Sequence, residues 1–142
     1  GYLCMNYRNV YVAQISMGAN RVQTQQAFME AMAYDGPSLI IAYSPCIAHG
    51  INMMESSKIA KDAVECGYWP LYRFNPSLPK GERFSWDAHE PRGDFLNFVQ
   101  NERRFSALYD RAPDEACALL ETARKESQRN WRFLQKLGAL MN

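Results

Sequence analysis

The sequence predicts an α/β fold: a partial, doubly wound parallel sheet of about three strands, with flanking helices and a long C-terminal helix. Three observations support this prediction. A β-branched and aromatic run at residues 10–16 is followed by a stretch of helical periodicity, an apolar run occupies residues 38–43, and residues 93–142 are helical in pattern. Strands that alternate with helices pair in parallel through right-handed crossovers.

The first half of the chain supplies two of the strands. Residues 1–9 are expected to form the last turns of a helix, and residues 10–16 form the first strand because β-branched and aromatic side chains favour strands. Asn20 can cap a helix over residues 22–33. The buried stripe predicted for that helix is Val22, Ala27, Phe28, Ala31 and Met32. The apolar run at 38–43 is typical of a strand covered on both faces.

The second half adds one strand and several helices. Asn52 and Glu55 have capping-box spacing, which predicts a helix over residues 53–66 that ends at Gly67. Residues 68–74 are a third strand, placed at a sheet edge because Pro70 lacks an amide donor. Residues 84–86 are a brief extended piece, and Asp94 and Pro113 open helices. The stripe predicted for the last helix is Ala116, Leu119, Leu120, Ala123, Trp131 and Leu134.

Composition excludes several classes of partner. Sixteen Lys and Arg against fifteen Asp and Glu leave a net charge of +1 over 142 residues, which gives no electrostatic reason to expect nucleic acid or an anionic membrane surface. No apolar run approaches the roughly 18 residues of a membrane span, and no signal peptide is recognisable. The four cysteines (Cys4, Cys46, Cys66 and Cys117) form no CxxC pair. We expect free thiols and a cytoplasmic location.

Reactive side chains gather in one of two loops. Open α/β sheets bind ligands at the carboxyl ends of their strands, which selects the loops at residues 17–20 and 44–50. Cys46 lies in the second loop, where it is either a small buried apolar residue or a ligand-binding thiol. With His49 it could form half a zinc site or a Cys–His nucleophile pair oriented by Asp87 or His89. His49 could equally have no special task.

Several ordered blocks resemble one known family. They are GYLCMNYRNVYVAQISMGAN, GPSLIIAYSPCIAHGI, ECGYWPLYRFNP, FSWDAHEP and FLNFVQNERRFSAL. Together they resemble the part of pyruvate:ferredoxin (flavodoxin) oxidoreductases that follows the thiamine-diphosphate motif. The resemblance covers nearly the whole chain. It implies that residues 1–92 are the C-terminal half of a thiamine-diphosphate-binding α/β domain and that residues 93–142 are its helical extension.

The resemblance also implies a reaction and its cofactors. Such enzymes oxidatively decarboxylate pyruvate with coenzyme A to acetyl-CoA and CO₂, and they pass electrons through iron–sulfur clusters to ferredoxin or flavodoxin. Cys46 matches the fourth ligand of the 4Fe–4S cluster nearest the thiamine diphosphate, and His49 would be a neighbour of that cluster. Thiamine diphosphate and Mg²⁺ would be bound mainly by the remainder of a parent protein, which is expected to be a homodimer. The 142 residues alone are expected to be inactive.

Three departures from the family pattern leave other classes open. The Gly-Asp-Gly magnesium motif and the other cluster cysteines are missing, and residues 52–55 replace the usual glycine-rich basic turn. One alternative is a non-catalytic interaction module whose last helix exposes an apolar stripe between Ala116 and Leu134. The other is a free-standing Cys–His hydrolase, which needs Cys46 within roughly 4 Å of His49 or His89.

Overall fold

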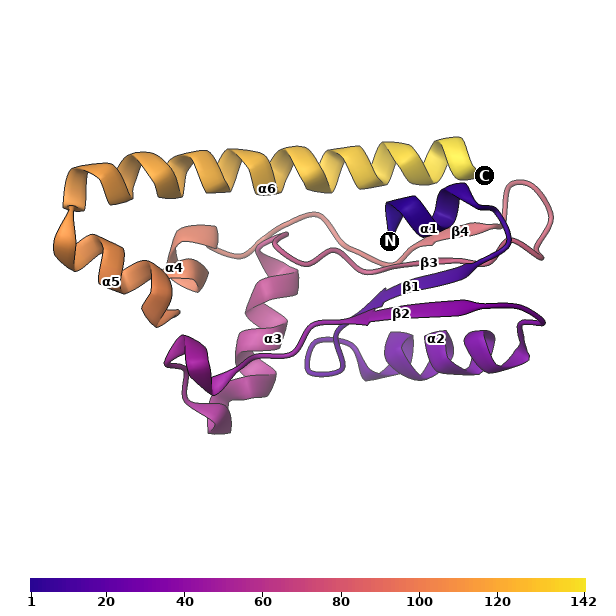
Figure 1. The fold of residues 1–142 in the computed structure, drawn as a ribbon, viewed down its shortest axis with the longest axis horizontal. Coiled ribbons are helices and arrows are strands. Elements are labelled where there is room, and N and C mark those ends of the chain that lie inside the picture. The colour runs from indigo at the N-terminus through magenta and orange to yellow at the C-terminus, as the bar shows by residue number, and fades with distance from the viewer.

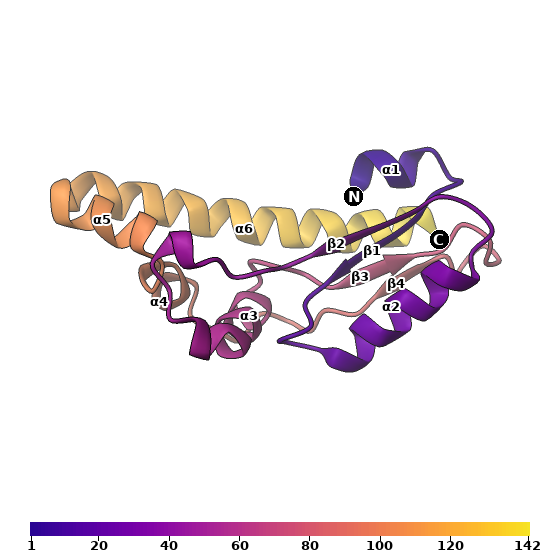
Figure 2. The same ribbon diagram turned by 60° about the horizontal axis from the view of Figure 1, so that its bottom comes forward.

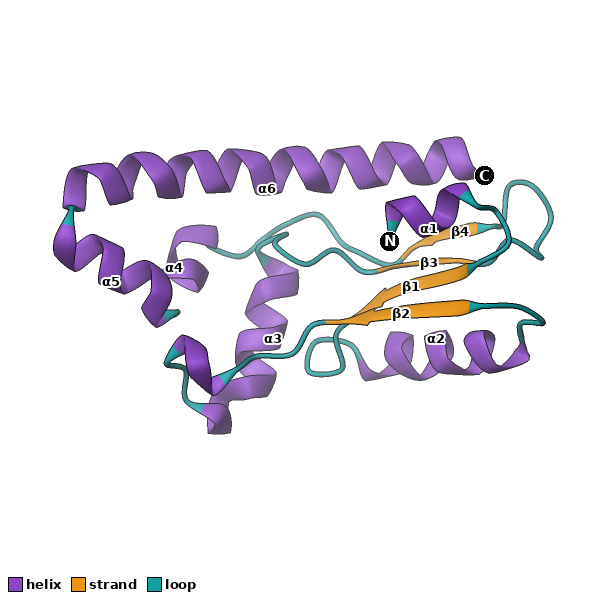
Figure 3. Ribbon diagram, in the orientation of Figure 1, coloured by secondary structure: helices purple, strands orange, loops and turns teal.

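The chain folds around one mixed sheet. A computed structural model describes the backbone of residues 1–142 and the side chains of residues 1–48, 50–102 and 106–142. Within it, strands β1 (Tyr11–Ile15), β2 (Ser38–Ala42), β3 (Tyr72–Phe74) and β4 (Phe84–Trp86) lie in the order β2-β1-β3-β4 (Figure 1). The helices, coloured in Figure 3, are α1 (Tyr2–Asn6), α2 (Arg21–Ala33), α3 (Ser56–Glu65), α4 (Phe95–Gln100), α5 (Arg103–Arg111) and α6 (Pro113–Met141).

The α/β class is confirmed, and the strand pairing is corrected in part. β1 and β2 pair in parallel through α2, as expected, but β3 is antiparallel to β1 and β4 is antiparallel to β3. The predicted parallel sheet of about three strands is therefore corrected to a mixed sheet of four strands, in which only β1 and β2 pair in parallel. Pro70 precedes β3 rather than lying in it, and β4 pairs with the outer side of β3. The prediction of an edge position for β3 is therefore also wrong.

β2 is one outer strand of the sheet. Its ladder with β1 is bracketed by two hydrogen bonds, from the Tyr11 amide to the Pro37 carbonyl and from the Tyr43 amide to the Ile15 carbonyl, each 3.0 Å. In a parallel ladder this places the backbone groups of Ser38, Ile40 and Ala42 on the other side, where no strand of the described chain pairs with them. β2 is partly exposed along its length, so the described residues do not give it the expected cover on both faces.

Helices cover both faces of the sheet. α1 and α6 pack on one face and α2 on the other (Figure 2). The largest apolar cluster lies between the sheet and α6. Alternate residues of the strands point to this face of the sheet and pack there against α1 and α6. This cluster contains Met5, Val12, Tyr72, Phe74, Phe84, Leu134 and Leu137. No helix of the described residues is both long enough and apolar enough to cross a membrane.

The buried face of α2 is partly polar, contrary to the predicted stripe. Gln23, Thr24 and Ala27 are the buried residues of this helix. Val22 is 76% exposed and Met32 is 86% exposed, and other apolar side chains of α2, Phe28 and Met29, are exposed as well. The prediction therefore succeeds only at Ala27 and, in part, at Ala31. The reason is an ionic network between α2 and the sheet.

Arg73 is the centre of this network. The Arg73 guanidinium donates to both carboxylate oxygens of Asp87, at 2.8 and 3.0 Å, and to the carboxylate of Glu30 on α2. The Tyr11 hydroxyl donates to Glu30 at 2.9 Å, and Gln23 donates to Asp87 at 3.1 Å. Burial, followed by the contact with Glu30, raises the pKa of Tyr11 well above its ordinary value, so this hydroxyl keeps its proton. These bonds pair Glu30 and the amide nitrogen of Gln23 inside the fold, while the buried Gln23 Oε1 has no hydrogen-bond partner among the described residues.

The remaining helices depart from the predictions at their ends. The stretch expected to be one helix from residue 53 begins as a 3₁₀ turn, η2 (Met53–Glu55), and α3 starts only at Ser56. The Asn52 side chain accepts a hydrogen bond from the Met54 amide instead of forming a capping box. On α6 the predicted apolar residues are buried or partly buried except Leu119, which is 55% exposed. An exposed stripe would have favoured the interaction-module hypothesis, and the structure does not show one over most of these residues.

Gly138 lets α6 approach β4 closely. A Cβ at this position would lie 2.5 Å from Cδ1 and 2.6 Å from Cε1 of Phe84, a buried ring in the main apolar cluster. We expect Gly138→Ala to destabilise the fold by about 1–3 kcal/mol, because overpacking here outweighs the gain in helix propensity. Urea unfolding checks this, with Ala118→Gly at an exposed position of the same helix as the control. An increase in stability for Gly138→Ala would contradict the close packing.

Candidate functional site

Three strands end at the same edge of the sheet. β2 is parallel to β1, and β4 runs in the same direction because both β1 and β4 are antiparallel to β3. The segments that follow these strands, at residues 16–20, 43–52 and 87–93, therefore leave the sheet at its carboxyl edge, beside α3 (Figure 1). The first two are the loops selected from the sequence. The third could have been found only by knowing that β4 joins the sheet.

The loop after β1 packs tightly on α3. A Cβ at Gly18 would lie 2.7 Å from Cβ of Ala60 and 3.1 Å from Cα of Ser57. Next to this contact, a cavity of about 260 Å³ opens between the first two loops and the starts of α2 and α3. Its lining includes Gly18, Arg21, Tyr43, Pro45, Ser56 and Ser57. The edge therefore has the concave shape expected of a ligand-binding region.

Cys46 directly follows Pro45, one of the residues that line this cavity. Its backbone is extended, with φ −128° and ψ 136°, and it precedes the 3₁₀ turn η1 (Ile47–His49). The residue is exposed and has no disulfide partner. Of the two interpretations drawn from the sequence, the structure excludes the buried apolar residue. A thiol in this position is free to bind a group that approaches the sheet edge from outside.

Sites made of several side chains of this chain are not supported. Among the side chains that the structure describes, no three His, Cys, Asp or Glu residues gather closely enough to hold a metal ion. The side chain of His49 lies outside the described set, so the predicted roles of this residue remain predictions. Asp87 is bound by Arg73 and Gln23, and His89 lines a different cavity, with Asn20 and Lys61. No hydrogen bond of the described residues joins Cys46 to His89, so the hydrolase hypothesis gains no support.

The donor chemistry of Cys46 fits an iron–sulfur cluster in one respect. Such clusters are bound by cysteine thiolates, and an exposed thiol on a loop at the carboxyl edge can serve as one of them. The described side chains contain no group of three or more His, Cys, Asp or Glu residues that could hold a metal ion, so they do not make a complete cluster site by themselves. The Gly-Asp-Gly motif does not occur in the sequence.

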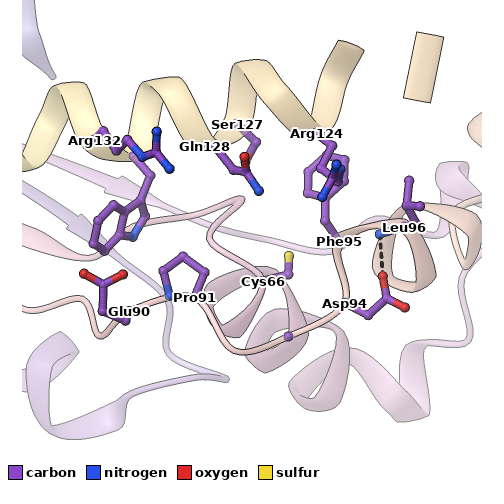
Figure 4. Close-up of a pocket in the computed structure, with 12 residues that line it drawn as sticks. Cys66, Glu90, Pro91, Asp94, Phe95, Leu96, Arg124, Ser127, Gln128 and Arg132 are labelled. Atoms are coloured by element: carbon purple, nitrogen blue, oxygen red, sulfur yellow. Dashed lines mark hydrogen bonds between the residues drawn. The ribbon is translucent and has the colours of Figure 1, made fainter. Parts of the chain in front are cut away.

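A second cavity lies between α6 and the C-terminal end of α3. It measures about 370 Å³, and Figure 4 shows Cys66, Glu90, Ser127 and Gln128 around it. Cys66 is 7% exposed, and its thiol contacts the Ala63 carbonyl at 3.6 Å. Burial raises the pKa of Cys66 to about 11. A thiol that keeps its proton is a poor nucleophile and metal ligand, so this cavity is not the better candidate site.

The thiols should therefore differ in reactivity. At pH 8 we expect iodoacetamide to modify Cys46 and Cys117, which are both exposed, while Cys66 reacts about 100-fold more slowly than an unburied thiol. Because the folded state retains the Cys66 proton, its contribution to stability is complete below about pH 8.5. That contribution is lost as the pH rises through about 11. Mass spectrometry of the alkylated peptides measures the order in which the cysteines react with iodoacetamide. Modification of Cys66 as early as that of Cys46 would contradict its burial.

The fold and the site together define part of an open α/β domain with an exposed cysteine at the candidate ligand-binding edge. No protein-family model matches the chain. It is 45% identical over 139 residues to pyruvate:ferredoxin oxidoreductase of Moorella thermoacetica and 44% identical over 141 residues to pyruvate-flavodoxin oxidoreductase of Nostoc sp.. These alignments cover 96% and 98% of this chain and about 12% of each relative. The chain belongs to the pyruvate:ferredoxin/flavodoxin oxidoreductase family, of which it represents one segment.

A more distant relative has a different name. The pyruvate dehydrogenase [NADP(+)] of Cryptosporidium parvum is 36% identical over 151 aligned residues, which cover 96% of this chain and 8% of that protein. The printed names of these relatives share pyruvate and differ in the electron acceptor. The resemblance inferred from the five sequence blocks is therefore confirmed at the level of the family.

Proposed function

We propose that this chain acts as a segment of a larger pyruvate oxidoreductase. In the proposed reaction, pyruvate and coenzyme A give acetyl-CoA and CO₂, with release of a proton and a pair of electrons. The electrons would leave through iron–sulfur clusters to ferredoxin or flavodoxin. The supporting observation is 44–45% identity to two pyruvate oxidoreductases over 96–98% of the chain.

Cys46 is the residue of this chain proposed to bind a cofactor. We propose it as one thiolate ligand of a 4Fe–4S cluster whose other ligands lie in the remainder of the parent protein. Its exposed position, directly after a residue that lines an open cavity, supports this role. Such a cluster, when bound, accepts and passes on single electrons. The contribution of the chain is to hold the thiol in place and to shape the surface around it.

Thiamine diphosphate and Mg²⁺ are proposed to bind mainly outside this chain. We propose residues 1–92 as the C-terminal half of the domain that binds them and residues 93–142 as its helical extension. The protein would work in the cytoplasm, which agrees with its four free thiols. We propose a homodimer as the assembly of the parent.

Two surfaces are suited to contact the remainder of the parent. The outward face of α2 exposes Val22, Met29 and Met32, at 76%, 63% and 86%. The backbone of β2 lacks a neighbouring strand on its outer side within the described chain. Exposed apolar side chains and unpaired strand edges are typical of surfaces that another chain segment covers. We propose that the remainder of the parent covers both.

The test compares the full-length protein that contains this chain with the 142 residues alone. Reduction of a viologen dye is followed with pyruvate and coenzyme A, and acetyl-CoA is measured by mass spectrometry. We expect activity in the full-length protein that disappears when either substrate is omitted, and none in the 142-residue chain. Reduction by the full-length protein with other 2-oxo acids but not with pyruvate would contradict the substrate, and activity of the isolated chain would contradict the role as a segment.

A further inference from the structure

Two hydrogen-bond donors converge on one carbonyl at the base of the Cys46 loop. The Ile15 carbonyl, at the end of β1, accepts from the Tyr43 amide at 3.0 Å. It also accepts from the indole Nε1 of Trp69 at 3.0 Å. The first bond is the last of the β1–β2 ladder, and the second comes from the segment between α3 and β3. A carbonyl oxygen has two lone pairs, so both bonds can form together.

Trp69 is itself held from both sides. Its backbone amide donates to the Ala63 carbonyl of α3 at 2.9 Å. The next residue, Pro70, accepts a hydrogen bond of 2.8 Å at its carbonyl from the Gln14 side chain of β1. The indole is therefore fixed relative to both α3 and β1, and only its own torsions remain to be set by packing.

The same indole packs against the last residue before the loop. The ring centroids of Trp69 and Tyr43 are 5.5 Å apart at an angle of 54°. Tyr43 also packs edge-on against Tyr68, at 6.5 Å. Only Ser44 and Pro45 separate Tyr43 from Cys46, and Pro45 restricts the backbone between them. Cys46 is exposed, so its own packing does little to fix its position. The nearest preceding residue in the chain that is held by a hydrogen bond and by ring contacts is Tyr43.

We propose that Trp69 is a positioning residue for Cys46. Its indole N–H and its ring fix the point at which the chain leaves β2, and thereby limit where the Cys46 sulfur can lie. This inference rests on the proposed function, because it takes Cys46 to be a cluster ligand. Groups that orient metal ligands without touching the metal control the affinity and potential of the site.

Two substitutions separate the hydrogen bond from the ring. Trp69→Phe keeps an aromatic ring against Tyr43 but removes the donor to Ile15. Trp69→His loses the six-membered ring but retains an N–H, because Nε2 of histidine occupies the same place in its five-membered ring as Nε1 of tryptophan. Trp131→Phe is the matched control. Trp131 is a buried indole that packs edge-on against Trp86 and has no hydrogen bond to the loop.

The experiment uses the full-length holoenzyme that contains this chain. We would measure iron content, the EPR line shape and reduction potential of the reduced clusters, and amide hydrogen exchange of the peptide covering residues 38–52. For Trp69→Phe we expect faster exchange in that peptide, a broadened EPR signal and a shifted potential for one cluster. Trp131→Phe should match the unsubstituted holoenzyme in all three measurements. Trp69→His should lie closer to the unsubstituted holoenzyme than Trp69→Phe does.

Two results would overturn the inference. One is that Trp69→Phe has the same EPR line shape, reduction potential and exchange rate as the unsubstituted holoenzyme. The other is that Trp69→His changes these three quantities as much as Trp69→Phe does. Cys46→Ala in the same background separates this failure from failure of the proposed function. If Cys46→Ala keeps every cluster unchanged, the ligand assignment is wrong. If it loses a cluster while Trp69→Phe has no effect, only the positioning role is wrong.

Discussion

Replacing Cys46 with alanine in the full-length protein should remove one cluster, or about four iron atoms per chain. Pyruvate-dependent dye reduction should fall to background, because the thiolate is lost from a site that needs all its ligands. Cys46→Ser should retain part of the iron, since an alkoxide is a weaker ligand for iron than a thiolate. Iron and acid-labile sulfide analysis, together with EPR of the reduced protein, measures the change.

Cys117→Ser is the matched control for this experiment. Cys117 is also exposed, but it lies on α6 and contacts the Tyr109 hydroxyl at 3.3 Å. We expect it to leave iron content and activity unchanged. If Cys46→Ala retains the full iron content and the parent EPR spectrum, Cys46 is not a ligand and the functional site has to be sought elsewhere along the edge.

Replacing Arg73 with methionine should destabilise the fold by about 3–5 kcal/mol, because it leaves two partly buried carboxylates without their buried cation. The side chains of Glu30 and Asp87 are 27% and 16% exposed, so water replaces the guanidinium poorly. The midpoint of urea unfolding, followed by circular dichroism, measures the loss. Methionine is close in length to the aliphatic part of arginine, so the effect comes mainly from charge.

A surface pair and a repaired variant test the cause. Arg129 pairs with Glu126 at 3.5 Å, with side chains 79% and 64% exposed, and Arg129→Met should leave the midpoint nearly unchanged. Adding Glu30→Gln and Asp87→Asn to Arg73→Met should recover part of the lost stability. A loss at Arg129 as large as that at Arg73, or no recovery in the triple variant, would show that the network is not the source of the stability.

The parallel pair of strands could be predicted, whereas the direction of β3 could not. β1 and β2 are runs of β-branched, aromatic and aliphatic residues separated by a helix, a pattern that leaves few topologies. β3 has only three residues, and its direction depends on pairing with both β1 and β4. Local sequence does not contain that information. For the same reason Pro70 was misleading, because its place just before the strand is set by tertiary contacts.

The orientation of α2 was unpredictable for a different reason. Its apolar residues have helical spacing, and such a stripe usually faces the core. Here Glu30 meets Arg73, 43 residues further along the chain, and this contact turns the polar side inward. A buried Arg on a strand is visible in the sequence only as an isolated charge. Outward-facing Val22, Met29 and Met32 are the consequence, and they belong to the surface proposed to contact the parent protein.

Cys46 was predicted as a site residue from its place after an apolar strand and from a family resemblance, and its role as a ligand stays a prediction. Neither signal distinguished it fully from a buried cysteine, and its exposure in the structure does. In the sequence, Trp69 is only one residue of the run predicted as the third strand. Its hydrogen bond to Ile15 joins residues 54 positions apart, so no local pattern could reveal it. The one available hint was chemical, because a largely buried indole needs a partner for its N–H.

The open side of β2 also affects how the 142-residue chain behaves once separated from its natural surroundings. The same amide and carbonyl groups that would accept a strand of the parent can accept a strand from any other molecule, including another copy. Self-association of the separated chain should then increase with its concentration, although its net charge and core are ordinary. Its behaviour in the test tube would reflect a missing neighbour rather than a defective fold.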